Sequence, residues 1–143
     1  MTASHHTTHH KNKTLATVLA FLLGGLGLQR LYLRGPRDPW LWAHLASLPA
    51  AALVAALAPQ ADGFYKLLPV TLSVLIGLLE ALVLGLTSDE KWDARFNPGT
   101  GKRSDTQWPV AVVLVASMML GAGGLIATIS RFFDLLYTGG AYG

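Results

Sequence analysis

The sequence predicts an all-α integral membrane protein, a bundle of four transmembrane helices with a short interfacial helix after the third. Four apolar stretches, at residues 15–33, 40–58, 67–86 and 109–129, each approach the roughly 20 residues that cross ~30 Å of hydrocarbon at about 1.5 Å per residue. The 143-residue chain is 52% hydrophobic and only 13% charged. Because the charges fall almost wholly outside the apolar stretches, too few polar side chains remain to cover a water-soluble globule.

A polar tail, residues 1–12, contains His5, His6, His9 and His10. On a helix His5 would lie one turn from His9, and His6 one turn from His10. Histidine pairs with this spacing can bind transition metals. The alternative is a solvated tail, which we favour because no carboxylate or further ligand lies nearby. We therefore predict no metal site and no cofactor.

The first predicted span, residues 14–33, carries Gly24, Gly25 and Gly27, small residues that allow close helix packing. Lysines precede its apolar core, as in a signal peptide. No small-residue cleavage pattern follows, so we expect the segment to be retained.

The second span, residues 40–58, follows Asp38 and Pro39. Asp is a preferred helix N-cap, and Pro is tolerated at the first helical position because its missing N–H would be unpaired there anyway. The dipeptide therefore predicts where this helix begins.

The third span, residues 66–87, carries a stripe of small side chains that recur every four residues: Ser73, Gly77, Ala81 and Gly85. Gly121 and Gly124 supply a similar flat region in the last span. Two helix backbones can approach closely along such stripes. Packing within the chain is the favoured interpretation, because a four-span bundle must first pack its own helices; a dimer interface is the alternative.

A short surface helix is predicted at residues 88–97, because Trp92 and Phe96 lie one turn apart in an otherwise charged segment. A polar loop follows at residues 98–107, and residues 108–143 hold the fourth span and a C-terminal tail. Aromatic side chains near span ends are the predicted interfacial anchors: Tyr32, Trp40, Trp42, Trp92, Phe96 and Trp108.

Two blocks of sequence resemble the TM-two domain family, also called the NINE type. The first block is KNKT at residues 11–14 leading to LGGLGLQRLYL at residues 23–33; the family has a Gly-rich apolar helix that ends in Gly-x-His-Arg-Phe-Tyr-Leu-Gly. The second is LEA at residues 79–81 followed by LTSDEKWDARFN at residues 86–97, which is similar to the end of bacterial members. The resemblance implies a TM-two-like membrane domain over residues 13–97, within a small bacterial membrane protein of largely undefined role.

The sequence departs from the family pattern at several positions. Gln29 stands where the family often has His, Leu31 stands where it has Phe, and Arg34 precedes Gly35 where Gly usually follows directly. A full additional span also lies between the two blocks, whereas the family name implies a compact pair of helices.

The basic residues predict how the four spans are oriented, because cytoplasmic loops carry an excess of Lys and Arg. One side of a four-span bundle would hold Lys11, Lys13, Lys66 and Arg131. The other would hold Arg30, Arg34, Arg37, Lys91, Arg95, Lys102 and Arg103. We therefore expect a multi-pass protein of the bacterial inner membrane, with loops 34–39 and 88–107 cytoplasmic and both termini outside.

Three ionisable residues on three spans, Arg30, His44 and Glu80, are predicted to reach similar depth in one leaflet. An unpaired charge there costs at least ~2.5 kcal/mol, so the three should contact one another. One interpretation is an ion or proton relay that uses Glu80 and His44. The favoured one is a structural ion pair between Arg30 and Glu80, with His44 as a hydrogen-bonded neighbour.

These observations predict a non-enzymatic interaction or scaffold protein. No catalytic triad, phosphate loop or multi-ligand metal spacing occurs outside the His-containing tail. The expected partners are the lipid bilayer and either a second copy or another membrane protein; nucleic acid is not expected, because the basic residues flank apolar segments. The alternative is a small oligomeric ion-coupled or multidrug carrier, with Glu80 as the coupling carboxylate.

Overall fold

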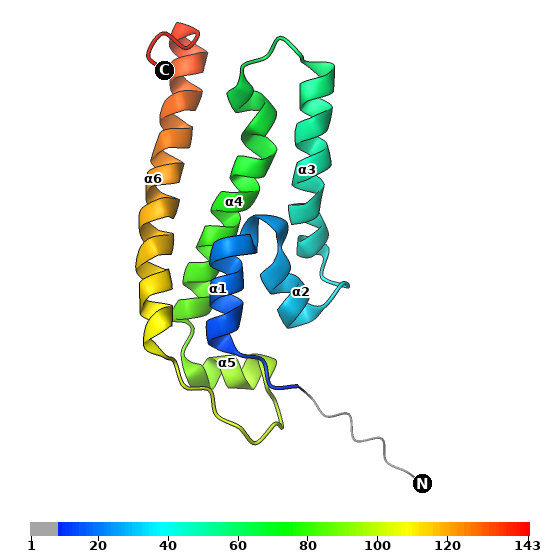
Figure 1. Ribbon diagram of the computed structural model, residues 1–143, viewed down its shortest axis with the longest axis vertical. Coiled ribbons are helices and arrows are strands. Elements are labelled where there is room, and N and C mark those ends of the chain that lie inside the picture. The colour runs from blue at the N-terminus through cyan, green and yellow to red at the C-terminus, as the bar shows by residue number, and fades with distance from the viewer. Residues whose placement is uncertain (1–8) are drawn as a thin grey trace.

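The computed structural model describes residues 9–143, so His5 and His6 of the predicted tail lie outside the described residues. Every regular element in the described part of the chain is helical (Figure 1). In chain order the elements are α1 (Lys13–Leu23), the short 3-10 helix η1 (Gly24–Leu26), α2 (Leu28–Arg34), α3 (Pro39–Leu57), α4 (Gly63–Leu86), α5 (Asp89–Phe96) and α6 (Trp108–Thr138). The predicted all-α class is confirmed.

Three of these helices, α3, α4 and α6, are long and apolar enough to cross a membrane. They lie side by side with alternating directions, and α4 packs against the other two (Figure 1). The Asp38 side chain accepts a hydrogen bond from the Trp40 N–H at 2.9 Å, so α3 begins where its capping dipeptide predicts. The last helix is longer than predicted, since it continues through residues 130–138 before Gly139 ends it.

The first apolar segment differs from the prediction, because residues 14–33 do not form one continuous helix. The chain turns back at η1, and α1 and α2 make a helical hairpin beside α4 (Figure 1). At Gly27 the backbone has φ +74°, a left-handed conformation that residues with a Cβ rarely adopt. The 11 residues of α1 rise only about 16 Å, half the hydrocarbon thickness.

The hairpin tip packs directly on the small-residue stripe of α4. A Cβ added to Gly77 would lie 2.5 Å from the carbonyl carbon of Gly24, so the two backbones touch. Two turns further along α4, a Cβ on Gly85 would lie 2.6 Å from Leu114 of α6 and 3.2 Å from Thr17 of α1. The stripe is therefore filled by contacts within the chain, the favoured of the two interpretations.

The glycines of α6 contribute less to this packing. A Cβ on Gly124 would meet Leu75 at 3.2 Å, and one on Gly121 would meet Leu78 at 3.7 Å. Only the first of these contacts is tight enough to require a neighbour to move.

The hairpin also changes the predicted topology. The start of α1 and the C-terminal end of α6 lie at opposite ends of the bundle (Figure 1). Lys13 Nζ lies 3.0 Å from Asp89 Oδ1 at the start of α5, so the N-terminal basic residues share an end with α5 and its loop. This arrangement of the described residues does not fit the prediction that both termini lie on one face, because the first segment folds back toward the end of the bundle where it starts.

The position of Trp92 also corrects a prediction. Helix α5 begins after Ser88 and lies across the end of the bundle, beneath α1 (Figure 1). Trp92 is fully buried there, and its indole N–H donates to the Lys11 carbonyl at 3.0 Å. It is a packed core residue and not a bilayer anchor. Trp40, Trp42 and Trp108 are all more than half exposed and remain candidate anchors.

Candidate functional site

A cluster of polar side chains lies between the hairpin and the helices α3 and α4. We call it the polar cluster; its members are Gln29, Arg30, Asp38, His44, Ser73 and Glu80. The structure thus brings together Arg30, His44 and Glu80, the three residues that the sequence places at one depth. They come from α2, α3 and α4 respectively.

Glu80 is held by donors on both of its oxygens. Arg30 Nη2 donates to Oε1 at 2.6 Å, and Arg30 Nε lies 3.0 Å from each oxygen. Gln29 Nε2 donates to Oε2 at 2.6 Å. Arg30 also reaches Asp38 Oδ2 at 3.4 Å, so one guanidinium lies between two carboxylates. Such forked, charge-assisted bonds fix the geometry of α2 relative to α4.

The hydrogen-bond pattern determines the protonation of one ring nitrogen of His44. Ser73 Oγ donates its single hydrogen to the Gly25 carbonyl at 2.7 Å. The same oxygen lies 2.7 Å from His44 Nδ1, so His44 must donate through Nδ1. Its Nε2 then faces Glu80 Oε1 at 3.5 Å. A continuous set of polar contacts therefore joins the Glu80 carboxylate to the hairpin tip.

This set of contacts explains how a hairpin tip can lie inside the bundle. Non-helical backbone at membrane depth is tolerated only where its polar groups find partners in the protein. Ser73 supplies that partner for the Gly25 carbonyl, and the Gly27 N–H bonds the Gly24 carbonyl at 3.0 Å. Ser73 has a chemical role here in addition to its small size.

Three members of the polar cluster were not assigned to it at the level of sequence, although Ser73 was predicted as a packing residue of α4. Gln29 is fully buried and is the one amide in the first apolar segment. A polar group in such a segment needs a partner, as a charge does, and this could have identified Gln29 from the sequence. Ser73 precedes Glu80 by seven residues, two helical turns, which places both on one face of α4. Asp38 was assigned only as a helix cap, although its side chain is 1% exposed and pairs with Arg30.

An open pocket of about 300 Å³ lies against the polar cluster. It runs between α2 and α4 and is bordered by α5 at one end. Its lining is mostly apolar with three arginines: Gln29, Arg30, Leu33, Arg34, Asp38, Trp40, Ile76, Leu79, Glu80, Val83, Leu84, Arg95 and Phe96. Glu80 is therefore both paired and reached by a pocket; its side chain is 15% exposed.

A second polar arrangement holds the N-terminus against α5, and we call it the N-terminal latch: Lys11, Asn12, Lys13, Tyr32, Asp89, Trp92, Asp93, Asn97, Ser104 and Thr106. Asn97 accepts from the Lys11 N–H at 2.6 Å and donates to the Lys11 carbonyl at 3.0 Å. The Tyr32 hydroxyl accepts from the Asn12 N–H at 2.8 Å. The latch thereby joins α1, α2 and α5.

Two aspartates of α5 fasten the loop at residues 97–107 to the latch. Asp93 accepts from the Ser104 hydroxyl at 2.5 Å and from its N–H at 2.7 Å, and these bonds lower the pKa of Asp93 to about 2. The Thr106 hydroxyl lowers the pKa of Asp89, and the hydrogen bond from Lys13 acts in the same direction. Both carboxylates are therefore charged at neutral pH.

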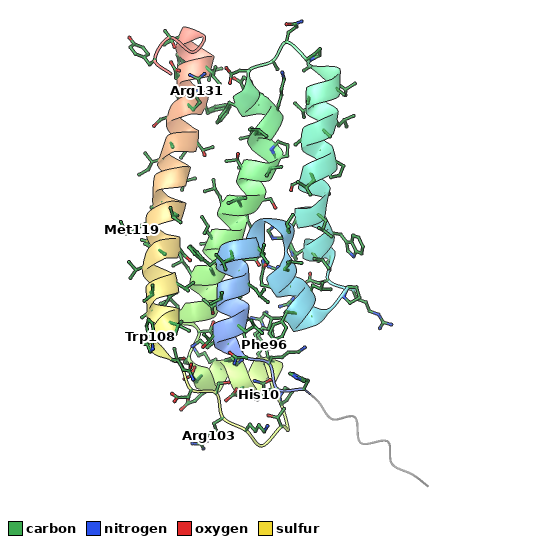
Figure 2. All side chains as sticks on the ribbon, viewed as in Figure 1. His10, Phe96, Arg103, Trp108, Met119 and Arg131 are labelled. Carbon is green, nitrogen blue, oxygen red and sulfur yellow. The ribbon has the colours of Figure 1, made fainter. Side chains whose placement is uncertain are left out.

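The remaining histidines of the tail give no metal site in the part of the chain that the structure describes. No group of three His, Asp or Glu side chains there could hold a metal ion. His10 Nε2 instead lies 3.4 Å from Ser104 Oγ, beside the latch (Figure 2).

The two sequence blocks that resemble the TM-two family meet in space. Lys11 and Tyr32 from the first block contact Asn97 and Trp92 from the second, directly or through the latch. Arg30 from the first block likewise pairs with Glu80 from the second. No family model, curated protein or solved structure matches this chain. The function is therefore inferred from the polar cluster, the latch and the pocket beside Glu80.

Proposed function

We propose that this protein is a small multi-pass membrane protein of the TM-two type, with three transmembrane helices and a re-entrant hairpin. Helices α3, α4 and α6 would cross the bilayer, because each has the length and apolarity to do so. The hairpin of α1 and α2 would enter from one face and return to it, since α1 rises only about 16 Å. Helix α5 would lie at that same face.

The distribution of basic residues supports a cytoplasmic α5 end. Nine of the eleven Lys and Arg residues lie at that end of the bundle: Lys11, Lys13, Arg30, Arg34, Arg37, Lys91, Arg95, Lys102 and Arg103. Only Lys66 and Arg131 lie at the other end, where they bond Pro59 and Asp62 respectively. Figure 2 labels Arg131 there. The positive-inside rule then places the N-terminus and loops 34–39 and 88–107 in the cytoplasm, and the C-terminus outside.

The fold supports the TM-two assignment in two ways. With the first apolar segment folded into a hairpin, α3 and α4 are the pair of long helices within residues 13–97, so the additional span no longer counts against the resemblance. Residues of the two blocks make most of the latch and the ion pair between Arg30 and Glu80.

The proposed activity is a non-enzymatic interaction or scaffold role, and the pairing of Glu80 is the observation that carries it. Both oxygens of Glu80 already accept hydrogen bonds from Arg30 and Gln29. A coupling carboxylate must exchange its partner for a transported ion, whereas a carboxylate held in this way fixes the hairpin to α4. The result is a rigid end of the bundle that presents α5 and the basic loops to a partner.

Cysteine labelling tests the proposed topology, since the chain has no native cysteine. Single cysteines at His9 and Lys102 should react only from the cytoplasmic face, and one at Tyr142 only from outside. Labelling of His9→Cys and Tyr142→Cys from the same face would contradict three crossings.

Isolation from its own membranes in mild detergent tests the scaffold role. We expect a membrane-protein partner in fixed stoichiometry, or a stable homo-oligomer, and its loss when the exposed residues Glu90 and Lys91 of α5 are replaced by Ala. Replacing the exposed residues Val112 and Val115 of α6 in the same way is the matched control. A partner-free monomer from the parent protein would contradict the proposal.

The carrier remains a second candidate, because the pocket reaches Glu80. It requires Glu80 to leave Arg30 during transport. Proteoliposomes with an imposed ion gradient would then show flux that Glu80→Gln abolishes. If the parent protein and Glu80→Gln both show only background flux, the carrier hypothesis is eliminated and the structural role of Glu80 is retained.

A further inference from the structure

The pocket beside the polar cluster has an uneven distribution of charge. Arg30 is engaged by Glu80 at 2.6 Å and by Asp38 at 3.4 Å, so these three side chains largely satisfy one another. Arg34 is 44% exposed and reaches Asp38 only at 3.9 Å. Arg95 contacts the Phe96 ring at 5.4 Å and has no ion pair with any residue from 9 to 143. The pocket therefore offers two guanidiniums to an anion.

The two arginines lie at one end of the pocket, at the level of α5. Arg34 is the last residue of α2, and Arg95 is in the last turn of α5. Both elements end at the membrane face where the proposed topology places the headgroups. A ligand phosphate at this position would lie at its usual depth in the bilayer.

The wall of the pocket extends away from these arginines along α4. Ile76, Leu79 and Val83 line it and are spaced along about two turns of the helix. All three are at least 40% exposed, so their side chains face the space that lipid would fill. An anion-binding site that continues into an apolar, exposed wall matches the shape of an amphiphile. A free phosphate would not need the apolar wall.

We propose that this pocket binds an anionic phospholipid, with its phosphate at Arg34 and Arg95 and its upper acyl chain along α4. Basic pockets at the cytoplasmic ends of membrane helices recognise anionic headgroups by this combination of charge and depth. The inference rests on the proposed membrane placement of the α5 end. It adds a ligand class to that end of the molecule, beside the rigid polar cluster.

A titration of the full chain in uncharged detergent micelles tests the site, with bound lipid counted by native mass spectrometry. The probe is dihexanoyl phosphatidylglycerol, compared with dihexanoyl phosphatidylcholine, the glycerophosphoglycerol headgroup alone and inorganic phosphate. We expect one phosphatidylglycerol per chain, with roughly tenfold or greater preference over phosphatidylcholine. The headgroup alone and inorganic phosphate should bind much more weakly, because they cannot use the apolar wall.

A charge-matched pair of variants makes the test specific. Each guanidinium near an anionic headgroup contributes about fivefold in affinity, so Arg34→Gln with Arg95→Gln should weaken binding roughly 30-fold. The control, Arg37→Gln with Arg103→Gln, removes the same charge from exposed loop positions outside the pocket and should change affinity less than about twofold.

Three results would overturn the site. Equal weakening in the two double variants would mean that net charge alone attracts the lipid. Equal binding of phosphatidylcholine and phosphatidylglycerol would show that the arginines do not select an anionic headgroup. Equal binding of the headgroup alone and of the whole lipid would show that the apolar wall does not contribute. None of these results depends on which face of the membrane α5 occupies, so failure here is distinct from failure of the cysteine-labelling test.

Discussion

The two ends of the bundle are held together in different ways. At the α5 end, the polar cluster and the N-terminal latch join α1, α2, α3, α4 and α5 through side-chain hydrogen bonds between residues far apart in sequence. At the opposite end only α3, α4 and α6 are present (Figure 1). There Arg131 bonds Asp62 at 3.2 Å and Asp134 at 2.7 Å, with side chains 12–39% exposed.

This difference shows where a small membrane protein can place rigidity. Between membrane helices there is little hydrophobic driving force, because lipid tails are as apolar as the side chains they contact. Polar contacts and close backbone packing must therefore supply specificity, and both are concentrated at the α5 end. An apolar recess of about 530 Å³ lies between α4 and α6 beyond the hairpin tip, lined by residues such as Phe21, Leu75 and Leu120.

Removing a buried aromatic at the α5 end should have the largest effect. Trp92→Ala should lower stability by about 4 kcal/mol, because it leaves a cavity and frees the Lys11 carbonyl. Phe133→Ala, in the exposed part of α6, should cost less than about 1 kcal/mol. Thermal or denaturant unfolding in one detergent measures both. Comparable losses would break the distinction between the two ends.

Breaking the central ion pair should have the next largest effect. Glu80→Gln and Arg30→Gln should each cost about 3 kcal/mol, since each leaves a charge with its partner gone in a low-dielectric setting. The double variant should recover about 1 kcal/mol or more relative to the sum of the single losses, because the pair is removed together. Recovery stays incomplete, since Asp38 also loses Arg30. Strictly additive losses would show that the two side chains do not interact.

A single methyl group at the hairpin contact should cost about 2 kcal/mol by overpacking. Gly77→Ala places a Cβ 2.5 Å from the Gly24 backbone, which cannot move without shifting the tip. Gly123→Ala is the matched control, because nothing lies within 4 Å of its Cβ and Ala is the better helix former by about 1 kcal/mol. The comparison is sharpened if the first variant loses stability and the second gains it. A neutral Gly77→Ala would place the tip farther from α4.

Acid should release the loop of the latch from Asp93 as the pH falls toward 2. Because the pKa of Asp93 is about 2 in the folded protein, below the roughly 3.9 of an unfolded chain, its contribution is present above pH 4 and is lost as the pH falls toward 2. A spin label at Lys102 should therefore become more mobile in that window, and one at the exposed Met119 in the apolar part of α6 should not. In Asp93→Asn the label at Lys102 should show no such transition.

Hydropathy and span length predicted most of the architecture from sequence alone. Helices α3, α4 and α6 follow from long apolar runs, because such runs can satisfy their backbone in hydrocarbon only as helices. The depth argument also brought Arg30, His44 and Glu80 to one place, since a charge far from water must find a partner. These are properties of the residues and their solvent, and no neighbouring element is needed to state them.

Only the tertiary structure decided the path of the first apolar segment. Residues 14–33 have the composition of a span. The sequence alone does not distinguish a glycine that continues a helix from one that forms a turn, because the packing around the glycine decides between them. Here the Gly24 backbone packs against Gly77, and the Ser73 hydroxyl donates a hydrogen bond to the Gly25 carbonyl. The chain that turns back therefore gains contacts that a straight helix would lack. The end of the bundle at which α1 begins and the burial of Trp92 follow from that turn, because contacts between residues distant in sequence determine both.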